Sequence, residues 1–491
     1  MLNAKVRSQY QPTIGIECHV QLKSKTKLFS GVDNDARSAP PNTLVSHICF
    51  GLPGALPVLN KEAVHLAARA AFALNSSPQK FSKFDRKHYF YPDLPMGYQI
   101  TQYDEPIIIG GHVNIELSGK TKGVGITRAH LEADAGKSTH PEGKDYSLVD
   151  LNRAGTPLLE IVSEPDMHSA EEAKAYAREL YLLMRYAGVS DTNLYYGNMR
   201  FDVNVSVSKD HKPGIRTETK NINSFRSVEK AVEYEIDRQI ELIEKGQKIV
   251  QETKGWDDIK QKTFTQRTKE NADDYRYMPD PDLPPLVLES DYIENIKKEM
   301  PLMPNQWRSK LASLGLDSDY VEILLDAEVE EGGVSYLSLI ERTTSDPDLA
   351  KFITNWFVNL EIPRRREGGV SALKDSERWI IYEKVHQLFY EKKISSTNVK
   401  QILIKLIFDE NVLPENFDEY LKTNNLTQIS SENELEKIVD QVIAANTKAA
   451  EDVKKGEVKA IGFLVGQTMQ ASKGSANPNV AQEMIKKKLG L

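Results

Sequence analysis

The residues best suited to chemistry are acidic and imidazole side chains within short apolar runs. The run IGIECHVQL contains Glu17, Cys18 and His19. In an extended strand, Glu17 and His19 project to one face while Cys18 projects to the other. Glu132 and Glu160 occupy similar strand-like runs, AHLEAD and PLLEIV. A buried carboxylate is costly unless it pairs with or coordinates a cation, so these acids and the histidine are candidate metal ligands.

Such donors favour a hard divalent cation. Mg²⁺ prefers carboxylate oxygens and water, and it bridges to substrate phosphates. A histidine ligand keeps Mn²⁺ and Zn²⁺ open as alternatives. Each glutamate would instead point to solvent if the sheet had one exposed face. Glu160 fits that second interpretation least well, because apolar residues flank it on both sides.

Mixed charges follow along two further strand-like segments. The runs RFDVN and RTETKN alternate basic and acidic side chains. Arginine offers bidentate contacts to phosphoryl oxygens, so the mixture suits phosphates and their metal. An exposed ladder of cross-strand ion pairs is an equally good interpretation. The side chains concerned are Arg200, Asp202, Arg216, Glu218 and Lys220.

The sequence gives little support for a P-loop, a zinc site or a cysteine–histidine nucleophile. The segment DAGKS resembles the end of a phosphate-binding P-loop, but Leu131 stands where that motif requires its first glycine. Cys18, His19 and Cys49 lack the closely spaced pairs that are typical of a zinc site. Nothing points to a third, orienting group for a cysteine–histidine nucleophile.

The composition is that of a multidomain globular protein. The 491 residues include 63 Lys and Arg against 71 Asp and Glu, a net charge of −8, which argues against a uniformly basic nucleic-acid surface. Two cysteines cannot build a disulfide framework, so we expect a reducing, cytoplasmic location. No apolar run approaches the roughly 18 residues that span a bilayer.

The first part of the chain mixes strands and helices. Residues 201–207 alternate polar and apolar side chains, which predicts a strand with one buried face. Apolar stripes predict helices over residues 62–75 and 169–186, and Ser169 with Glu172 forms a capping signature. Because no regular βαβ alternation is visible, the pattern favours an α+β fold over a doubly wound parallel sheet.

The later part of the chain is helical in pattern. The proline-dense residues 279–285 predict a domain edge or a rigid connector. A second seam is expected near residues 409–416. The predicted helices are 291–300, 304–314, 317–331, 345–358, 375–392, 396–409, 432–446, 456–471 and 478–489.

The C-terminal end is basic, unlike the chain as a whole. Residues 453–491 contain seven lysines and two glutamates, a net of +5. This charge suits contact with a phosphate backbone. Lysines that complement a helix dipole are the alternative.

Several long motifs occur together in one order. They are IGIECHVQL (14–22), GLPGALPVLN (51–60), YFYPDLPMGYQ (89–99), HLEADAGK (130–137), DLNRAGTP (150–157), MRFDVNVS (199–206), DYRYMPDPD (274–282) and GFLVGQTMQ (462–470). With these motifs the sequence resembles the B-subunit family of the aspartyl/glutamyl-tRNA(Asn/Gln) amidotransferases over nearly its whole length.

The resemblance implies three domains. A cradle domain similar to glutamine synthetase and guanidino kinases, with a mainly antiparallel sheet, is expected over residues 12–293. An all-α helical domain would follow over residues 294–409. A helical tail domain that contacts the body of the tRNA would complete the chain over residues 410–491.

The resemblance also implies an activity within a heterotrimer. An amidase A subunit would release ammonia from glutamine, and a small C subunit would complete the complex. This chain would use ATP and Mg²⁺, with Mn²⁺ as an alternative, to phosphorylate the side-chain carboxylate of Glu-tRNA(Gln) or Asp-tRNA(Asn). Ammonia would then displace phosphate. The second hypothesis is a tRNA-binding scaffold without a catalytic centre.

The metal ligands that the resemblance implies are His19, Glu132 and Glu160, with Glu17 as a neighbour. Glu132 and Glu160 are also expected to act in catalysis. The other predicted site residues are charged groups near the acyl phosphate and the nucleotide, namely Arg200 and Lys220 in catalysis and Arg216, Asp202 and Glu218 at the cofactor.

The sequence departs from the family pattern at one point. Many relatives carry zinc-binding cysteines before the GLPG motif. Ser30, Val32 and Ser46 occupy three of those positions here, which leaves Cys49. We therefore expect no structural zinc and a buried Cys49.

Overall fold

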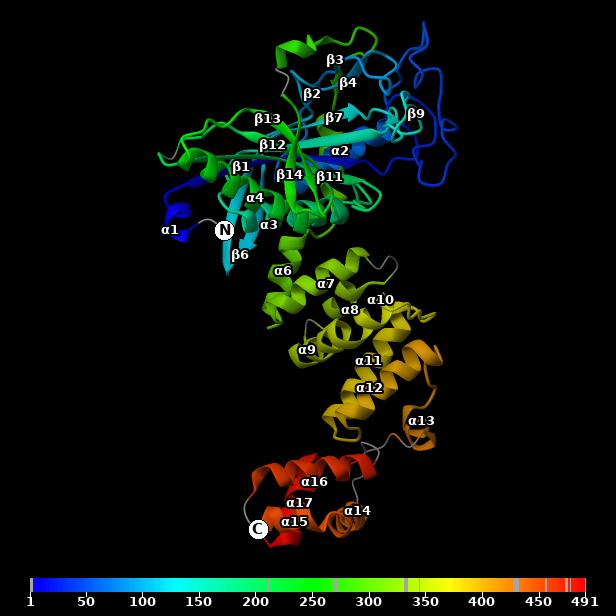
Figure 1. Ribbon diagram of the computed structural model, residues 1–491. Coiled ribbons are helices and arrows are strands. Elements are labelled where there is room, and N and C mark those ends of the chain that lie inside the picture. Colours follow the sequence, from blue (N-terminus) through cyan, green and yellow to red (C-terminus); the bar gives the residue numbers. More distant parts are fainter. Residues whose placement is uncertain are drawn as a thin grey trace. The chain divides into compact units, whose positions relative to one another are not determined.

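The computed structural model describes residues 3–210, 212–268, 272–330, 334–343, 345–424, 426, 432–454, 457–472, 476 and 478–490. The chain divides into two compact units, Met1–Gln306 and Trp307–Leu491 (Figure 1). The first combines a sheet with helices, and the second is helical, which confirms the predicted α+β class. Among the described residues, no helix is long and apolar enough to cross a membrane.

A nine-stranded sheet forms the centre of the first unit. Its order is β14-β13-β12-β11-β1-β10-β7-β5, and β6 also pairs with β7. Every pairing is antiparallel except that of β12 with β13. The strands are β1 (Gln11–Gln21), β5 (Ile108–Ile109), β6 (His112–Leu117), β7 (Lys120–Ala133), β10 (Pro157–Ser163), β11 (Met199–Ser208), β12 (Thr217–Ile222), β13 (Glu252–Asp257) and β14 (Lys262–Thr268).

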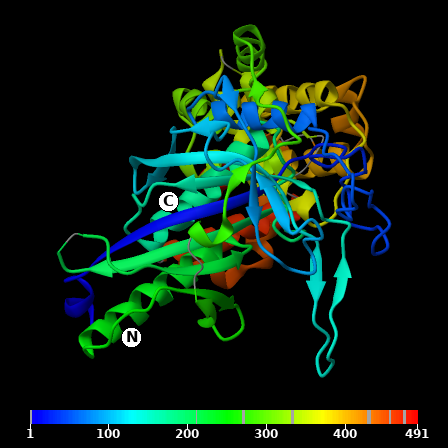
Figure 2. The ribbon, with the colours of Figure 1, turned by 90° about the horizontal axis from the view of Figure 1, so that it is seen from above.

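Three small sheets complete the first unit. The strand β3 (Asp85–His88) lies between β4 (Tyr98–Thr101) and β15 (Met278–Pro279). A second sheet pairs β2 (Phe81–Ser82) with β16 (Leu286–Val287), and β8 (Lys137–Thr139) and β9 (Leu148–Asp150) form a hairpin that projects from the main sheet (Figure 2). The proline-dense segment 279–285 therefore connects two strands within the first unit.

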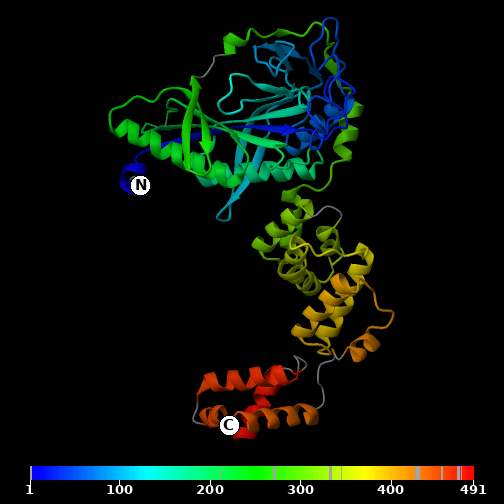
Figure 3. The same ribbon diagram turned by 45° about the vertical axis from the view of Figure 1, so that its right-hand side comes forward.

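Three helices cover one face of the main sheet (Figure 3). They are α2 (Lys61–Ala73), α3 (Ala170–Tyr186) and α4 (Phe225–Glu244), and the first two confirm predicted helices. The Ser169 side chain accepts the backbone N–H of Glu172, as the capping signature predicts. Alternate residues of β1, including Cys18, are buried in the apolar core that these helices share with the sheet. The 20-residue α4 is absent from the predicted helices.

The prediction of one buried face for residues 201–207 is wrong, because both faces are buried. Phe201 and Val203 lie in the apolar core, while Asp202 and Asn204 are buried on the opposite face. β11 is an inner strand between β1 and β12, and charged side chains of those neighbours cover its polar face instead of water.

Helices account for the second unit and for the segment that leads into it. Each of the nine predicted helices overlaps an observed one, and the stretches predicted to reach residues 358 and 409 end in π-helical turns, Phe357–Glu361 and Lys405–Asp409. The helices are α5 (Ser290–Lys298), α6 (Pro304–Ser313), α7 (Ser318–Glu330), α8 (Tyr336–Glu341), α9 (Pro347–Trp356), α10 (Ile362–Arg366), α11 (Asp375–Tyr390), α12 (Ser396–Ile404), α13 (Phe417–Thr423), α14 (Glu432–Ala445), α15 (Thr447–Lys454), α16 (Val458–Ala471) and α17 (Pro478–Leu489).

The last four helices, α14 to α17, enclose an apolar cluster of their own that includes Leu435, Val439 and Leu464. Part of the basic C-terminal charge is paired there, because Lys488 lies 3.0 Å from Asp440 and Lys486 lies 3.1 Å from Glu483. Lys455 and Lys473 fall outside the described residues. The seam near residues 409–416 and the tRNA contact of the tail stay predictions.

Candidate functional site

The face of the sheet opposite the helices carries the predicted metal ligands. His19 on β1 lies directly opposite Glu160 on β10 and opposite Arg200 on β11. Glu160 in turn lies opposite His130 on β7. Residues that are directly opposed on neighbouring antiparallel strands have Cβ atoms roughly 5 Å apart. Strand register therefore gathers side chains from four strands into one row.

His19, Glu132 and Glu160 form a first group, which we call the His19 cluster. His19 Nε2 lies 3.7 Å from Glu132 Oε1 and 3.5 Å from Glu160 Oε2. One ligand atom from each of the three residues lies within 4.8 Å of the others. His19 Nδ1 is buried and has no hydrogen-bond partner. The structure thus brings together the three residues that the sequence proposed as metal ligands.

His130 adds a second imidazole beside the His19 cluster. Its Nε2 lies 3.5 Å from Glu160 Oε2 and 3.9 Å from Glu132 Oε2. Sequence reasoning did not select this residue as a ligand. The signal was present, because His130 precedes Glu132 by two positions and so projects from the same face of the strand.

The two carboxyl groups of the His19 cluster have pKa values that are shifted in opposite directions. Burial and the nearby Glu160 raise the pKa of Glu132 to about 7. Burial also disfavours the Glu160 carboxylate, but His130 and His19 outweigh it and lower the pKa of Glu160 well below its usual range. Burial opposes the His19 imidazolium, whereas Glu160 raises its pKa. Two adjacent buried carboxylates ionise together at low cost only beside a compensating cation.

Glu17, Asp202 and Glu218 form a second group, the Glu17 cluster. Glu17 on β1 lies opposite Asp202 on β11, and Asn204 on β11 lies opposite Glu218 on β12. One carboxylate oxygen from each of the three acids lies within 4.8 Å of the others. The structure therefore places Glu17 with the two acids proposed for the cofactor, one row away from His19.

The Glu17 cluster is already tied to neighbouring polar groups. Lys220 Nζ donates to Asp202 Oδ2 at 2.9 Å and lies 3.5 Å from Glu218 Oε1. Burial opposes the Asp202 carboxylate, but Lys220 lowers its pKa. Thr253 Oγ1 donates to Glu218 Oε2 at 2.9 Å. Asn204 Nδ2 donates to Glu17 Oε1 at 3.0 Å, while Asn204 Oδ1 is buried without a partner.

Two arginines meet at Asp134, beyond the predicted ligands. Arg200 Nη2 lies 3.3 Å from Asp134 Oδ1, and Arg153 Nε lies 3.2 Å from Asp134 Oδ2. Asp134 and Arg153 are additions that sequence reasoning missed. Arg216, a predicted cofactor contact, is exposed immediately before β12 and two residues from Glu218.

Lys87 on β3 brings a further positive charge to the site. Its Nζ lies 4.8 Å from the ring centroid of Tyr275 and 5.9 Å from that of Tyr89. Burial disfavours the ammonium, but Glu132, Tyr277 and Glu160 outweigh it and raise the pKa of Lys87. Lys87 was not predicted, although it lies two residues before the motif at 89–99.

The donor sets suit divalent cations. The Glu17 cluster offers oxygen donors alone, which fits Mg²⁺. The His19 cluster adds an imidazole, which fits Mn²⁺ as well. The unpartnered Asn204 Oδ1 and the proximity of the Glu132 and Glu160 carboxylates are the features that a bound cation would explain. With Arg200, Lys220 and Lys87 nearby, the arrangement can hold a polyphosphate and stabilise its negative charge.

Two family models match most of the chain. The GatB/GatE catalytic domain matches residues 12–294, and the GatB domain matches residues 338–489. The B subunit of the aspartyl/glutamyl-tRNA(Asn/Gln) amidotransferase of Geobacter sulfurreducens is 45% identical, over 98% of this chain and 99% of its own length. The proteins of the same name from Coxiella burnetii and Carboxydothermus hydrogenoformans are 44% and 40% identical, again over 98% of this chain and over 100% and 99% of their own lengths. The chain therefore belongs to the GatB/GatE family.

Proposed function

We propose that this chain is the B subunit of a tRNA-dependent amidotransferase. It transfers a phosphoryl group from ATP to the side-chain carboxylate of Glu-tRNA(Gln), Asp-tRNA(Asn) or both. Ammonia then attacks the acyl phosphate, and phosphate leaves as the amide forms. The names of the relatives support the substrate class, since they specify tRNA(Asn/Gln) and an amidotransferase.

One observation carries the proposal: two carboxylate clusters lie side by side on one face of the sheet. Glu17 and His19 are two residues apart on β1, and Arg200 and Asp202 are two residues apart on β11. The clusters are therefore neighbours that share β1, with the His19 cluster extending over β10 and β7 and the Glu17 cluster over β11 and β12. Phosphoryl transfer needs positioning and charge compensation more than covalent chemistry, and adjacent cation sites with flanking arginine and lysine supply both.

The side chains have separate tasks in this proposal. The His19 cluster and the Glu17 cluster would each hold one divalent cation, which would neutralise negative charge on the phosphates of ATP. Arg200, which Asp134 orients, and Lys220, which Asp202 orients, add fixed positive charge for the transferred phosphoryl group. Lys87 lies on the side of Glu132 and Glu160 and favours the anionic carboxyl group of the substrate.

The proposal requires partners. A carboxylate activated as an acyl phosphate must be shielded from water until ammonia arrives. The relatives are named as B subunits, which implies further subunits. We therefore assign the release of ammonia from glutamine to an amidase A subunit, with a small C subunit completing a heterotrimer. The basic tail is assigned to the body of the tRNA.

The decisive experiment uses the reconstituted three-subunit complex. Glu132→Gln and Glu160→Gln each remove one charge from the His19 cluster while preserving shape. Amide formation on misacylated tRNA, with ATP, Mg²⁺ and glutamine, should fall by roughly 10²-fold or more. Glu116→Gln changes an exposed residue on β6 and serves as the matched control, with unchanged turnover.

Binding measurements separate this function from the scaffold hypothesis. If the chain catalyses, the two variants bind misacylated tRNA as tightly as the wild type does. A non-catalytic scaffold would show weaker binding of tRNA and unchanged turnover of the tRNA that is bound. That second result would remove the assignment of catalysis to this chain.

The source of nitrogen gives an independent test. Without the amidase partner, glutamine should yield no product, whereas an ammonium salt should support some amide formation. Equal glutamine-dependent activity from this chain alone would contradict the division of labour within the complex.

A further inference from the structure

A buried lysine–cysteine pair lies outside the two carboxylate clusters. Lys27 is fully buried. Its Nζ donates to the backbone oxygens of Leu44 at 2.7 Å and Leu151 at 3.3 Å, and to Cys49 Sγ at 3.4 Å. The first two acceptors are neutral carbonyl groups. Cys49 is therefore the acceptor in this set that can carry a negative charge.

Charge balance favours a thiolate at Cys49. A buried ammonium is costly without a counter-ion. Burial opposes ionisation of Cys49, but Ser46 and Lys27 outweigh it and lower the pKa of the thiol. Ser46 Oγ lies 3.5 Å from Cys49 Sγ, and Ser30 Oγ lies 3.9 Å from it. Two hydroxyl groups thus lie within hydrogen-bonding distance of the buried sulfur.

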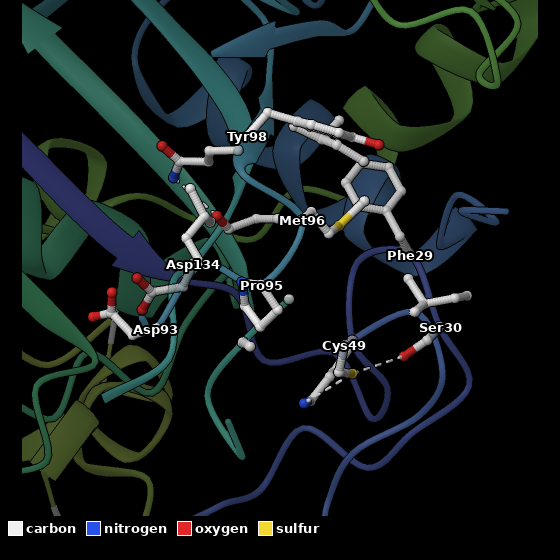
Figure 4. A pocket seen from close by; sticks show the side chains of 16 residues that line it. Phe29, Ser30, Cys49, Asp93, Pro95, Met96, Tyr98 and Asp134 are labelled. Carbon is white, nitrogen blue, oxygen red and sulfur yellow. Dashed lines mark hydrogen bonds between the residues drawn. The ribbon is translucent and has the colours of Figure 1, made fainter. Parts of the chain in front are cut away.

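Cys49 borders a small cavity. The cavity has a volume of about 40 Å³ and is lined on its apolar side by Phe29, Met96 and Tyr98. Figure 4 shows Cys49 next to Ser30, with Phe29 and Met96 as neighbouring side chains. A cavity needs roughly 15 Å³ of such volume to admit one water. A molecule the size of hydrogen peroxide therefore fits beside the sulfur.

Cys18, the other cysteine of the chain, provides an internal comparison. It lies on the core-facing side of β1 and is fully buried. Burial and the nearby Asp202 raise the pKa of its thiol well above the usual range. Since the thiolate is the reactive form of cysteine, the two sulfurs should differ strongly in reactivity.

We propose that Cys49 is a peroxide-reactive thiol and that Lys27 traps its sulfenic acid as a reversible sulfur–nitrogen cross-link. The site is independent of the proposed amidotransferase function, because it uses neither carboxylate cluster. The oxidant is hydrogen peroxide, supplied from solution.

The reaction balances in two steps. The Cys49 thiolate attacks one peroxide oxygen, the O–O bond breaks, and the departing hydroxide takes up a proton to become water. The sulfenic acid that remains is neutral, so Lys27 loses its counter-ion and releases its extra proton. The free amine then attacks the sulfur, an S–N bond forms, the S–O bond breaks, and a second water leaves. The sulfur loses two electrons, which the peroxide accepts.

Mass spectrometry of the peroxide-treated full-length chain tests the cross-link. We expect one cross-linked pair of peptides, one containing Lys27 and the other Cys49, about 2 Da lighter than the sum of the two peptides. A thiol reductant should cleave the cross-link and restore the separate peptides. Cys18→Ser should retain it, and Cys49→Ser should lose it. Lys25→Met, an exposed lysine in the same loop, should also retain it, whereas Lys27→Met should give a sulfenic acid that a dimedone probe captures.

Wild-type protein keeps the test decisive where Lys27→Met does not fold. At neutral pH, iodoacetamide should modify Cys49 at least about 10-fold faster than Cys18. Equal rates at the two cysteines would overturn the proposal. So would a wild-type chain in which Cys49 goes on to sulfinic acid, or gives a stable dimedone adduct, without any Lys27 cross-link.

Discussion

The His19 cluster and a network around Glu361 both bury charge, but they satisfy it differently. Glu361 in the second unit is fully buried. Its Oε1 accepts from Arg365 at 2.8 Å and lies 2.7 Å from Arg378 Nη2, while its Oε2 accepts from Tyr382 at 2.7 Å. Glu132 and Glu160 of the His19 cluster instead face the imidazoles of His19 and of the adjacent His130.

The difference separates a structural network from a binding site. A buried carboxylate that already has arginine and tyrosine donors has no need of a ligand, and its role is to hold helices together. A pair of carboxylates without a fixed ammonium or guanidinium between them is a liability to the fold that a bound cation relieves. The Glu17 cluster lies between these extremes, because Lys220 compensates part of its charge.

The largest expected effect separates activity from stability. Glu132→Gln should lower amide formation by about 10³-fold and leave the free energy of unfolding at neutral pH nearly unchanged, since it removes the carboxylate whose charge burial and Glu160 oppose. Glu361→Gln should do the reverse, with normal specific activity in the folded fraction and a clearly lower midpoint of urea unfolding. Similar effects of both variants on both quantities would contradict the distinction.

Replacing Arg378, an ion-pair partner of Glu361, should also lower the free energy of unfolding. Arg378→Met removes one of the two guanidinium groups that compensate the buried charge of Glu361, so we expect a loss of about 3 kcal/mol or more in the free energy of unfolding. Arg364→Met, which changes an exposed arginine nearby, is the control and should cost little. Chemical denaturation measures both variants, and equal values for the two would show that the network contributes nothing.

The His19 cluster should make the free energy of unfolding depend on pH in the metal-free protein. The pKa of Glu132 is raised from its ordinary 4.5 to about 7, so the folded form binds the proton more tightly than the unfolded form does. Protonated Glu132 therefore contributes to the free energy of unfolding. This contribution is complete below pH 4.5 and is lost as the pH rises to about 7, by at most about 3 kcal/mol.

Comparing the wild type with Glu132→Gln isolates the contribution of Glu132 to the pH dependence of stability. The difference in unfolding free energy between wild type and Glu132→Gln should change between pH 5 and pH 8, and saturating Mg²⁺ or Mn²⁺ should abolish that change. Identical pH profiles of the two metal-free proteins would mean that the fold does not raise the pKa of Glu132.

The smallest effect is expected at the Glu17 cluster. Thr253→Val removes the hydroxyl that donates to Glu218 Oε2, at nearly constant volume. We expect a several-fold increase in the KM for ATP, equivalent to about 1 kcal/mol, with little change in kcat. Thr263→Val, on the neighbouring strand β14, removes a hydroxyl that contacts Glu235 instead and should leave the KM for ATP unchanged. A fall in kcat alone would argue against a nucleotide role for Glu218.

Local patterns in the sequence determined much of the site. The two-residue period places Glu17 and His19 on one face of β1 and Cys18 on the other, as observed. Apolar stripes located α2, α3 and most helices of the later part of the chain. These inferences succeed because periodicity and capping depend on residues within a few positions of each other.

Tertiary structure decided which residues meet. Strand register placed Glu17 opposite Asp202 and not in the His19 cluster, and it placed His130 beside that cluster. Lys87 reached the site from a separate small sheet. β1 pairs with β10 and β11, strands that lie far along the chain from it, and no local pattern specifies such a pairing or its register.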